Sequence, residues 1–364
     1  MKRLICFLLF SIPVLSCLIF VNYKADPGNL FGTASEKMVE LFMDGKSAYV
    51  KSGNVEEREV DKKIIEALEE SPECIAVGPS LVRWVNSDMV GSEDFYNLGM
   101  SSGNGYDVLA IFGQLERNDK MPDKVLFCVD TLFFDKTIME NNKSWLSYEA
   151  DVQLALDMIG SSTELKASKL EFISTKTKKP RQLISLTYFQ SSMQYISENG
   201  ISSEEKIGEP KSDYKGAYYL KDNARVSAYS QENISKKDVE EAMKKYVSGE
   251  SNSNLEAAIT PNVHLDSEQM DNFKKLVTYL QSNNIEIKFF LHPFPPIVWD
   301  YIVESEKFPM VTELDTFIHE YSRENNIPIT GSYNPYDIGC KNEDFQDYRH
   351  MKAEKLYEYF DFTF

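Results

Sequence analysis

The sequence predicts a three-layer α/β/α sandwich around a parallel sheet, preceded by an apolar N-terminal helix and interrupted by a long insertion. Short apolar runs alternate with segments of helical spacing, and this pattern is typical of βαβ units. The alternation stops near residue 136 and resumes after Pro261. Between these points the chain is polar and irregular, so we expect an inserted subdomain that packs beside the sheet.

The N-terminal segment predicts a membrane anchor. Lys2 and Arg3 precede an uncharged run, Leu4–Val21, that is just long enough to span a bilayer. Basic residues before such a run favour an inside N-terminus and a body outside the cytoplasmic membrane. A cleaved signal peptide and lipidation at Cys17 are alternatives. No clear small-x-small cleavage site follows, and the apolar run continues beyond Cys17, so we favour an uncleaved, single-pass signal anchor.

These patterns divide the chain into five parts. We expect a signal anchor over residues 1–23, a juxtamembrane segment with a helix over 24–70, the first part of the α/β domain over 71–135, the insertion over 136–261, and the second part of the domain over 262–364.

The elements of the sheet follow from the apolar runs. Strands are predicted at 75–77, 94–99, 124–130, 285–291 and 327–330. Helices are predicted at 60–70, 108–115, 270–280 and 314–321, and two more begin at Ser80 and near Met351. Helical patches at 152–159 and 238–246 lie in the insertion. The central run at 124–130 has a continuous apolar centre, as expected of a strand that is buried on both faces.

Composition limits the classes of function. The chain has 364 residues, 42% of them hydrophobic, and a formal net charge of −18. This charge argues against nucleic acid as a partner and against a polybasic membrane patch. The basic cluster Lys176–Arg181 is accordingly interpreted as a solvated loop. The five cysteines show no zinc spacing, and no phosphate-binding loop is present, so no metal or other cofactor is implied.

One serine stands where a nucleophile would be useful. Ser80 follows a predicted strand and a Gly-Pro turn, and it precedes a predicted helix. At the carboxyl end of a strand and the start of a helix, unpaired N–H groups can stabilise the oxyanion that forms when an ester is attacked. The alternative is structural, because serine is a common helix cap.

A base for Ser80 can be sought among four histidines. His350 follows Asp347 by three residues, so both side chains can lie on one side of a turn. The aspartate would then hold the imidazole tautomer, although the pair could also be a helix cap. His292 ends a strand before Pro293 and is expected in the wall of the cleft.

The order of these blocks resembles the SGNH (GDSL-like) hydrolase superfamily, with Ser80 after the first strand, Gly99 after the second, and Asp347-Tyr348-Arg349-His350 near the C-terminus. The resemblance covers about residues 70–135 and 262–360. It implies a flavodoxin-like sandwich with Ser80 as nucleophile, His350 as base and Asp347 as its orienting group. The Ser80 and Gly99 N–H groups would contribute to the oxyanion hole.

Two positions depart from that pattern. Pro79 replaces the usual aspartate before the serine, and Asp130 stands where an asparagine would donate to the oxyanion. An ionised aspartate would repel an oxyanion unless its pKa were raised. Asn104 is a candidate replacement donor.

Three further residues are candidate substrate contacts: Asp130, His292 and Arg83. Arg83 would bind an anion or a sugar hydroxyl, with a surface salt bridge as the alternative. Trp84 is expected in the core rather than as a platform for a sugar ring.

The resemblance is strongest to membrane-anchored SGNH-like proteins that work beside polysaccharide O-acylation machinery in bacterial envelopes. It implies an extracytoplasmic O-acyltransferase or acetyl esterase that acts on a cell-envelope or exported polysaccharide. The alternative is a catalytically degenerate domain that binds glycan or scaffolds an integral-membrane acyltransferase.

Overall fold

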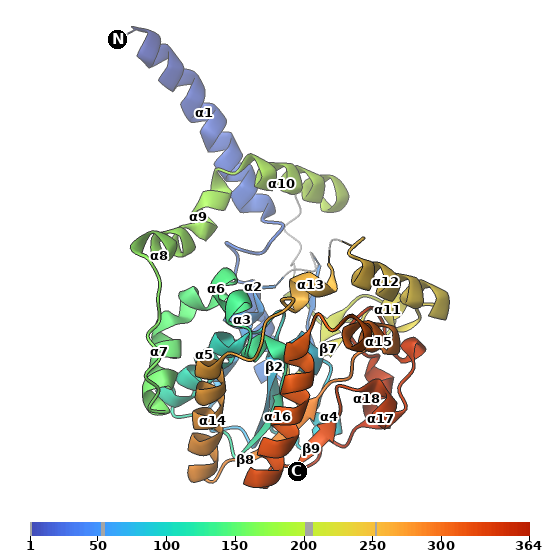
Figure 1. The fold of residues 1–364 in the computed structure, drawn as a ribbon. Helices are drawn as coiled ribbons and strands as arrows, with labels where there is room; N and C mark the ends of the chain where they lie inside the picture. Colours follow the sequence, from blue (N-terminus) through green and yellow to red (C-terminus); the bar gives the residue numbers. More distant parts are fainter. Residues whose placement is uncertain (1, 52–54, 201–206, 252) are drawn as a thin grey trace.

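The computed structural model describes residues 2–51, 55–200, 207–251 and 253–364 (Figure 1). Its centre is a five-stranded parallel sheet with the order β3-β2-β4-β8-β9. The strands are β2 (Cys74–Pro79), β3 (Phe95–Met100), β4 (Lys124–Cys128), β8 (Glu286–Leu291) and β9 (Ile329–Gly331). The predicted α/β class with a parallel sheet is confirmed, and each predicted strand is present with its ends shifted by a few residues.

Helices and loop segments cover the two faces of this sheet. Phe289 packs against Phe273 of α14 (Ser267–Ser282), whereas the next residue, Phe290, packs against Phe360 and Phe362 near the C-terminus. Successive side chains of a strand point to opposite faces, so this pair of phenylalanines marks the two layers that enclose the sheet.

The other helices of the body connect the strands or follow the last of them. They are α3 (Glu57–Ala67), α4 (Ser87–Val90), α5 (Gly105–Arg117), α15 (Pro296–Ser305), α16 (Pro309–Asn325), α17 (Pro335–Ile338) and α18 (Ala353–Tyr359). Short 3-10 turns are η1 (Ser80–Val82), η2 (Thr131–Phe133), η3 (Ser144–Tyr148) and η4 (Asn342–Asp344).

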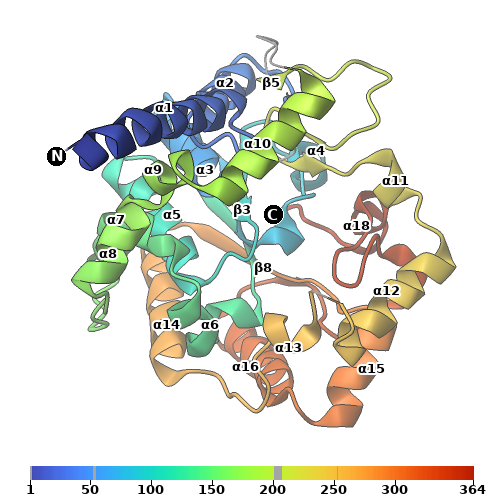
Figure 2. The ribbon, with the colours of Figure 1, turned by 90° about the horizontal axis from the view of Figure 1, so that it is seen from above.

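The predicted insertion, residues 136–261, divides into three parts. Its first helices are α6 (Lys136–Asn141) and α7 (Glu149–Met158), and α7 packs beside α5 of the body. The second part comprises α8 (Lys169–Lys176), α9 (Lys178–Leu183) and α10 (Leu186–Asn199). Helices α9 and α10 lie against the N-terminal helix, and α8 packs against η3 (Figure 2). The third part returns to the body through β5 (Ile207–Gly208), β6 (Tyr218–Tyr219), β7 (Arg225–Val226), α11 (Tyr229–Glu232), α12 (Lys236–Ser248) and α13 (Leu255–Ala258).

The third part of the insertion covers the edge strand β3. The Asn97 N–H donates to the Asp222 carbonyl oxygen at 2.8 Å, and Asn223 Nδ2 donates to the Asn97 carbonyl oxygen at 2.8 Å. The outer hydrogen-bonding groups of an edge strand would otherwise be available to another chain. The insertion therefore completes the sheet as well as adding a subdomain.

The N-terminal segment forms α1 (Lys2–Ala25), which projects away from the body, and it is followed by α2 (Ala34–Met43) and β1 (Tyr49–Val50) (Figure 1). In the part of the chain that the structure describes, no helix combines the length and the apolar character needed to cross a membrane. Cys17, Cys74, Cys128 and Cys340 are free thiols, and the last three are buried.

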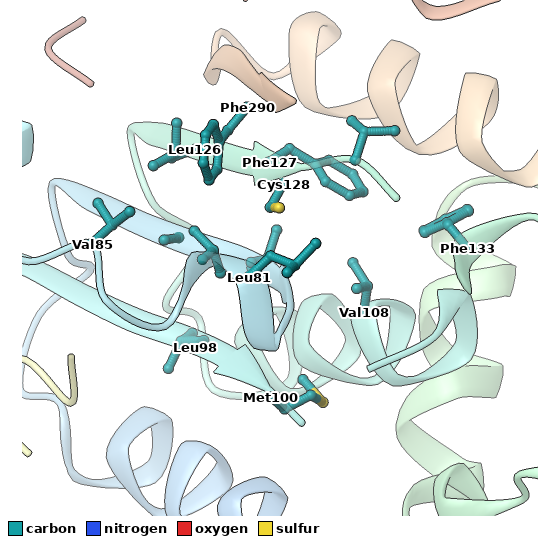
Figure 3. Close-up of a cluster of buried hydrophobic side chains, with 14 of the residues drawn as sticks. Leu81, Val85, Leu98, Met100, Val108, Leu126, Phe127, Cys128, Phe133 and Phe290 are labelled. Atoms are coloured by element: carbon teal, nitrogen blue, oxygen red, sulfur yellow. The ribbon is translucent and has the colours of Figure 1, made fainter. Parts of the chain in front are cut away.

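Apolar side chains anchor the turn that carries Ser80. Leu81 from η1 packs in one cluster with Val108 of α5, Cys128 of β4 and Phe133 of η2 (Figure 3). All four side chains are at most 4% exposed. The serine is thus mounted on a tightly packed part of the core, which limits how far its hydroxyl can move.

Candidate active site

Ser80, His350 and Asp347 form a hydrogen-bonded chain. Ser80 Oγ lies 2.8 Å from His350 Nε2, and His350 Nδ1 lies 2.9 Å from Asp347 Oδ2. Ser80 is the first residue of η1, directly after β2, and Asp347 and His350 lie in the loop before α18; Ser80 and His350 are 270 positions apart in sequence. The geometry is that of a nucleophile, a base and an orienting carboxylate, so the structure brings together the three residues predicted as a triad.

The backbone before Ser80 explains why the motif is Gly-Pro-Ser. Gly78 has φ of +138°, and a Cβ at this position would lie 2.6 Å from the carbonyl oxygen of Cys128. Only glycine fits this conformation and this close approach of β4. The helix predicted from Ser80 onward is wrong: only the 3-10 turn η1 follows, and a separate helix, α4, starts at Ser87 with Asn86 as its cap.

Trp84 packs against the base. Its ring centroid lies 4.9 Å from that of His350, and Trp84 Nε1 donates to Ser227 Oγ at 2.6 Å. The Ser227 hydroxyl donates in turn to Gln346 Oε1 at 2.7 Å. The Gln346 N–H donates to the His350 carbonyl oxygen at 2.9 Å. A buried network therefore ties the loop of the base to η1 and to the insertion.

The carboxylate of Asp347 is suited to orient the base. One of its oxygens, Oδ1, accepts the backbone N–H groups of Arg349 and His350, each at 2.7 Å. Burial alone would raise the pKa of Asp347, but the charge and hydrogen bonds of His350 and the two backbone N–H groups together lower it below its usual value. The aspartate therefore stays ionised beside the imidazole.

His292 lies behind the site and not at its surface, which corrects its predicted role in binding substrate. The side chain is 1% exposed, and its Nδ1 lies 2.8 Å from the Pro293 carbonyl oxygen. Its Nε2 accepts the N–H of Met351 at 3.4 Å. Burial, reinforced by the charges of Arg349 and His350, lowers the pKa of His292 well below its ordinary value, so the ring is neutral. It supports the backbone next to the base.

A cavity of about 890 Å³ opens over the triad. Ser80 and His350 lie in its wall, together with residues of α6, α12 and α13 from the insertion. Its aromatic lining includes Tyr246 of α12, which stacks on Tyr348 at a centroid distance of 4.2 Å. The size is that of a typical site for a small ligand or for part of a larger one.

Asp130 and Arg349 form an ion pair in the wall of this cavity. Arg349 Nη2 lies 2.6 Å from Asp130 Oδ2, and the guanidinium carbon lies 3.8 Å from the centroid of the Phe294 ring. The side chain of Asp130 is 6% exposed and that of Arg349 is 14% exposed. Arg349 Nη1 is shielded from solvent and has no hydrogen-bond partner among the described residues. Asp130 thus has the guanidinium of Arg349 as its charged partner in the cavity wall.

Two of the predicted oxyanion donors are engaged elsewhere. The Gly99 N–H donates to Asn97 Oδ1 at 2.9 Å on the side of β3 facing away from β2. Asn104 is the fully buried cap of α5: its Oδ1 accepts the N–H groups of Tyr106 and Asp107, and its Nδ2 donates to the Asn142 carbonyl oxygen at 3.4 Å. Neither residue lines the cavity, so both predictions are wrong. Ser80 does line it, and as the first residue of η1 its N–H has no partner within that turn.

Arg83 is also not a substrate contact. Its side chain is 2% exposed and forms an ion pair with Glu57. Glu57 Oε2 accepts the Ser101 N–H at 2.6 Å, and the adjacent Ser102 lines the cavity. Arg83 therefore supports the loop beside the site from within the core.

Arg349, Ser227 and Gln346 were not predicted as site residues, although the structure places them beside Asp130 and Trp84. Arg349 is inside the quoted Asp347–His350 block and was the one basic residue there, a signal that could have been paired with the unexpected Asp130. Ser227 and Gln346 carry no such signal, because only the fold brings them to Trp84. Among the residues that the structure describes, no cluster of histidine, cysteine and acidic side chains could hold a metal ion.

Comparison of the chain with models of known protein families gave no match, and comparison with curated proteins gave none either. The site must therefore be interpreted from its own geometry.

Proposed function

We propose that this protein is an SGNH-like serine acyltransferase or acyl esterase that acts on a cell-envelope or exported polysaccharide. The observation that carries the proposal is the chain from Ser80 Oγ through His350 to Asp347, with separations of 2.8 Å and 2.9 Å, in the wall of a large cavity. A helix cap, the structural alternative for Asp347 and His350, would not require the imidazole to reach a serine in the distant turn η1.

The reaction has two steps. Ser80 Oγ attacks the carbonyl carbon of an acyl donor while His350 Nε2 takes the hydroxyl proton and Asp347 stabilises the resulting imidazolium. Collapse of the tetrahedral intermediate transfers that proton to the leaving alkoxide and leaves an acyl-Ser80 ester. A sugar hydroxyl, or water in an esterase, then attacks this ester, gives its proton to His350, and releases Ser80.

The negative charge on the intermediate needs stabilising donors. The Ser80 N–H is one candidate, and the guanidinium of Arg349, a residue of the cavity wall, is the other. Asp130 holds the guanidinium from one side, and Phe294 supports its plane. An arginine fixed in this way can stabilise developing charge in place of the missing asparagine.

The envelope location is part of the same proposal. The uncharged run Leu4–Val21 lies in α1, preceded by Lys2 and Arg3. Ile12, Val14 and Phe20 of this helix are each more than half exposed, which is unfavourable in water. We therefore propose that α1 is a single-pass anchor and that the body lies outside the cytoplasmic membrane. An integral-membrane acyltransferase is a candidate partner.

A second candidate function is a degenerate domain that binds glycan or scaffolds such a partner. The observation in its favour is that Gly99 and Asn104 do not supply oxyanion donors and that an aspartate occupies the usual asparagine position. The intact hydrogen bonds of the triad argue for the enzyme.

Hydrolysis and transfer assays with acetyl esters would test the proposal. The wild type is expected to hydrolyse an activated acetyl ester, or to transfer its acetyl group to an acetyl-free oligosaccharide, whereas Ser80→Ala and His350→Gln lose the activity. Binding of oligosaccharide with no turnover in folded wild-type protein would instead favour the degenerate domain.

A further inference from the structure

Helices α8, α9 and α10 form an unusually exposed apolar surface. No residue of α8 or α9 is buried. Leu170 is 77% exposed, Ile173 53% and Leu186 69%, and Ile184 and Met193 are exposed as well. A short helix that buries none of its apolar side chains gains little stability in water, so this surface calls for a partner that covers it.

The same segment is basic in an acidic protein. Residues 165–187 contain six lysine and arginine side chains and one acidic residue, which gives a local charge of +5 against −18 for the whole chain. Glu171, the acidic residue, is paired with Lys143. Of the six basic residues, only Lys179 forms an ion pair with a described residue, Glu56. The charge of the whole chain therefore conceals a local basic surface, contrary to the expectation from composition.

This surface is fixed beside the N-terminal helix. Asn22 Nδ2 of α1 donates to the carbonyl oxygens of Gln182 and Leu183 at 3.0 Å and of Ser185 at 3.2 Å. The Tyr188 hydroxyl donates to Asp26 Oδ1 at 2.6 Å. As a result, α10 lies across the end of α1 nearest the body, in both views (Figures 1 and 2). Helices α1 and α8–α10 therefore lie on the same side of the body (Figure 1).

We propose that α8–α10 lie in the interface of an anionic lipid bilayer. Exposed apolar side chains together with unpaired lysine and arginine residues are the features of helices that lie on such membranes. A second copy of this chain fits less well, since the same basic surface would repel itself. A protein partner would fit the apolar residues, but it leaves the juxtaposition with the apolar α1 unexplained.

The placement has a consequence for the cavity over Ser80. Helices α6 and α13, which contribute to the cavity wall, lie on the side of the body nearest α10 (Figure 1). A bilayer that contacts α8–α10 would therefore lie on the same side of the body as the cavity. This arrangement suits an acyl donor or acceptor presented close to the membrane surface. The docking itself does not depend on the proposed chemistry.

Quenching by brominated lipids tests the docking. In the full chain, Leu170→Trp and Leu186→Trp each place a fluorophore on the surface, and Tyr336→Trp, at a position 57% exposed on α17, is the matched control. The emission of each added tryptophan is measured against the wild-type background of Trp84, Trp145 and Trp299. The protein is bound to vesicles of phosphatidylcholine with or without phosphatidylglycerol, with brominated acyl chains.

We expect the emission of the two surface tryptophans to fall about twofold in phosphatidylglycerol vesicles, because interfacial helices insert ~5–10 Å into the headgroup boundary. The control tryptophan keeps its emission. Quenching weakens in the triple variant Lys176→Glu/Lys178→Glu/Arg181→Glu, which reverses part of the positive charge of this surface. Thermal unfolding checks that the triple variant is folded. Ser80→Ala does not alter the quenching, which separates this result from the enzymatic proposal. Vesicle-bound protein with no quenching at either surface position would overturn the docking and favour a protein partner.

Discussion

Arg349 Nη2 lies 2.6 Å from Asp130 Oδ2, so the aspartate that follows β4 is part of an ion pair. Taken alone, the aspartate predicts a site that repels an oxyanion. Paired with the neighbour of the base, it instead positions a cation in the cavity wall, stacked on Phe294. The pair is mostly buried, so removing one partner leaves the other charge uncompensated.

The first prediction concerns this pair. Arg349→Met should reduce the rate of acyl-enzyme formation by a factor on the order of 10²–10³, the usual cost of losing one oxyanion donor. Asp130→Asn should reduce it by a smaller factor, because the guanidinium remains but is less firmly held. Pre-steady-state acylation of the two variants is the measurement. A gain of activity in Asp130→Asn would show that the aspartate suppresses catalysis and that the site has decayed.

The second prediction concerns the network behind the base. Ser227→Ala removes the hydroxyl that links Trp84 Nε1 to Gln346 Oε1, and should lower the free energy of unfolding by about 1–3 kcal/mol because buried partners lose their hydrogen bonds. The turnover number should fall more than the Michaelis constant changes, since the base is misplaced. Urea unfolding and steady-state kinetics check both effects. Ser191→Ala, on the exposed surface of α10, is the control and should change neither quantity.

The third prediction concerns the turn before the nucleophile. Gly78→Ala should destabilise the protein by more than about 1–3 kcal/mol, because it adds a clash with the Cys128 carbonyl oxygen to an unfavourable positive φ. Gly160→Ala is a matched control, since Gly160 also has positive φ, +62°, but has nothing within 4 Å of the added Cβ. Equal unfolding midpoints for the two variants would contradict the close approach of β4.

The fourth prediction concerns pH. His292 is neutral when folded because burial lowers its pKa, whereas in the unfolded chain it titrates near its ordinary value of about 6.5. Between the lowered pKa of folded His292 and about 6.5, the unfolded chain binds a proton that the folded protein does not bind. The contribution of His292 to stability is therefore complete above about pH 6.5 and is lost as the pH falls. Denaturant unfolding from pH 7.5 to 5 should show a steeper loss in the wild type than in His292→Leu. Parallel curves would mean that His292 is protonated in the folded protein.

Much of the sheet could be predicted because its strands are continuous apolar runs that end at glycine, proline or polar residues. The strand at 285–291, for example, was expected almost as it is observed, over Glu286–Leu291. The helix expected after Ser80 failed because Leu81, Trp84 and Val85 have helical spacing but pack around a 3-10 turn. Tertiary contacts, here with β4 and His350, override a short periodic pattern.

The contact of Ser80 with His350 and Asp347 could be predicted because local order along the chain carries the signal: a serine after the first strand, and an aspartate three residues before a histidine. The surroundings of Gly99 and Asn104 could not be predicted, because they depend on which neighbour each polar group contacts. Gly99 donates to the side chain of Asn97 and Asn104 caps α5, and neither choice is visible in the sequence pattern. The same is true of His292, expected at the end of a strand, and of Arg83, expected one turn into the helix after Ser80. Both were predicted to contact substrate, but both side chains are buried.

The most direct test of the central claim is the intact mass of the protein after brief incubation with an activated acetyl ester. We expect one acetyl adduct on the wild type and on Ser253→Ala, which removes another serine in the cavity wall, and no adduct on Ser80→Ala. Peptide mapping should place the adduct on Ser80. If well-folded wild type acquires no adduct and turns over no ester, or if Ser80→Ala is labelled to the same extent, Ser80 is not the nucleophile of an acyl-transfer reaction.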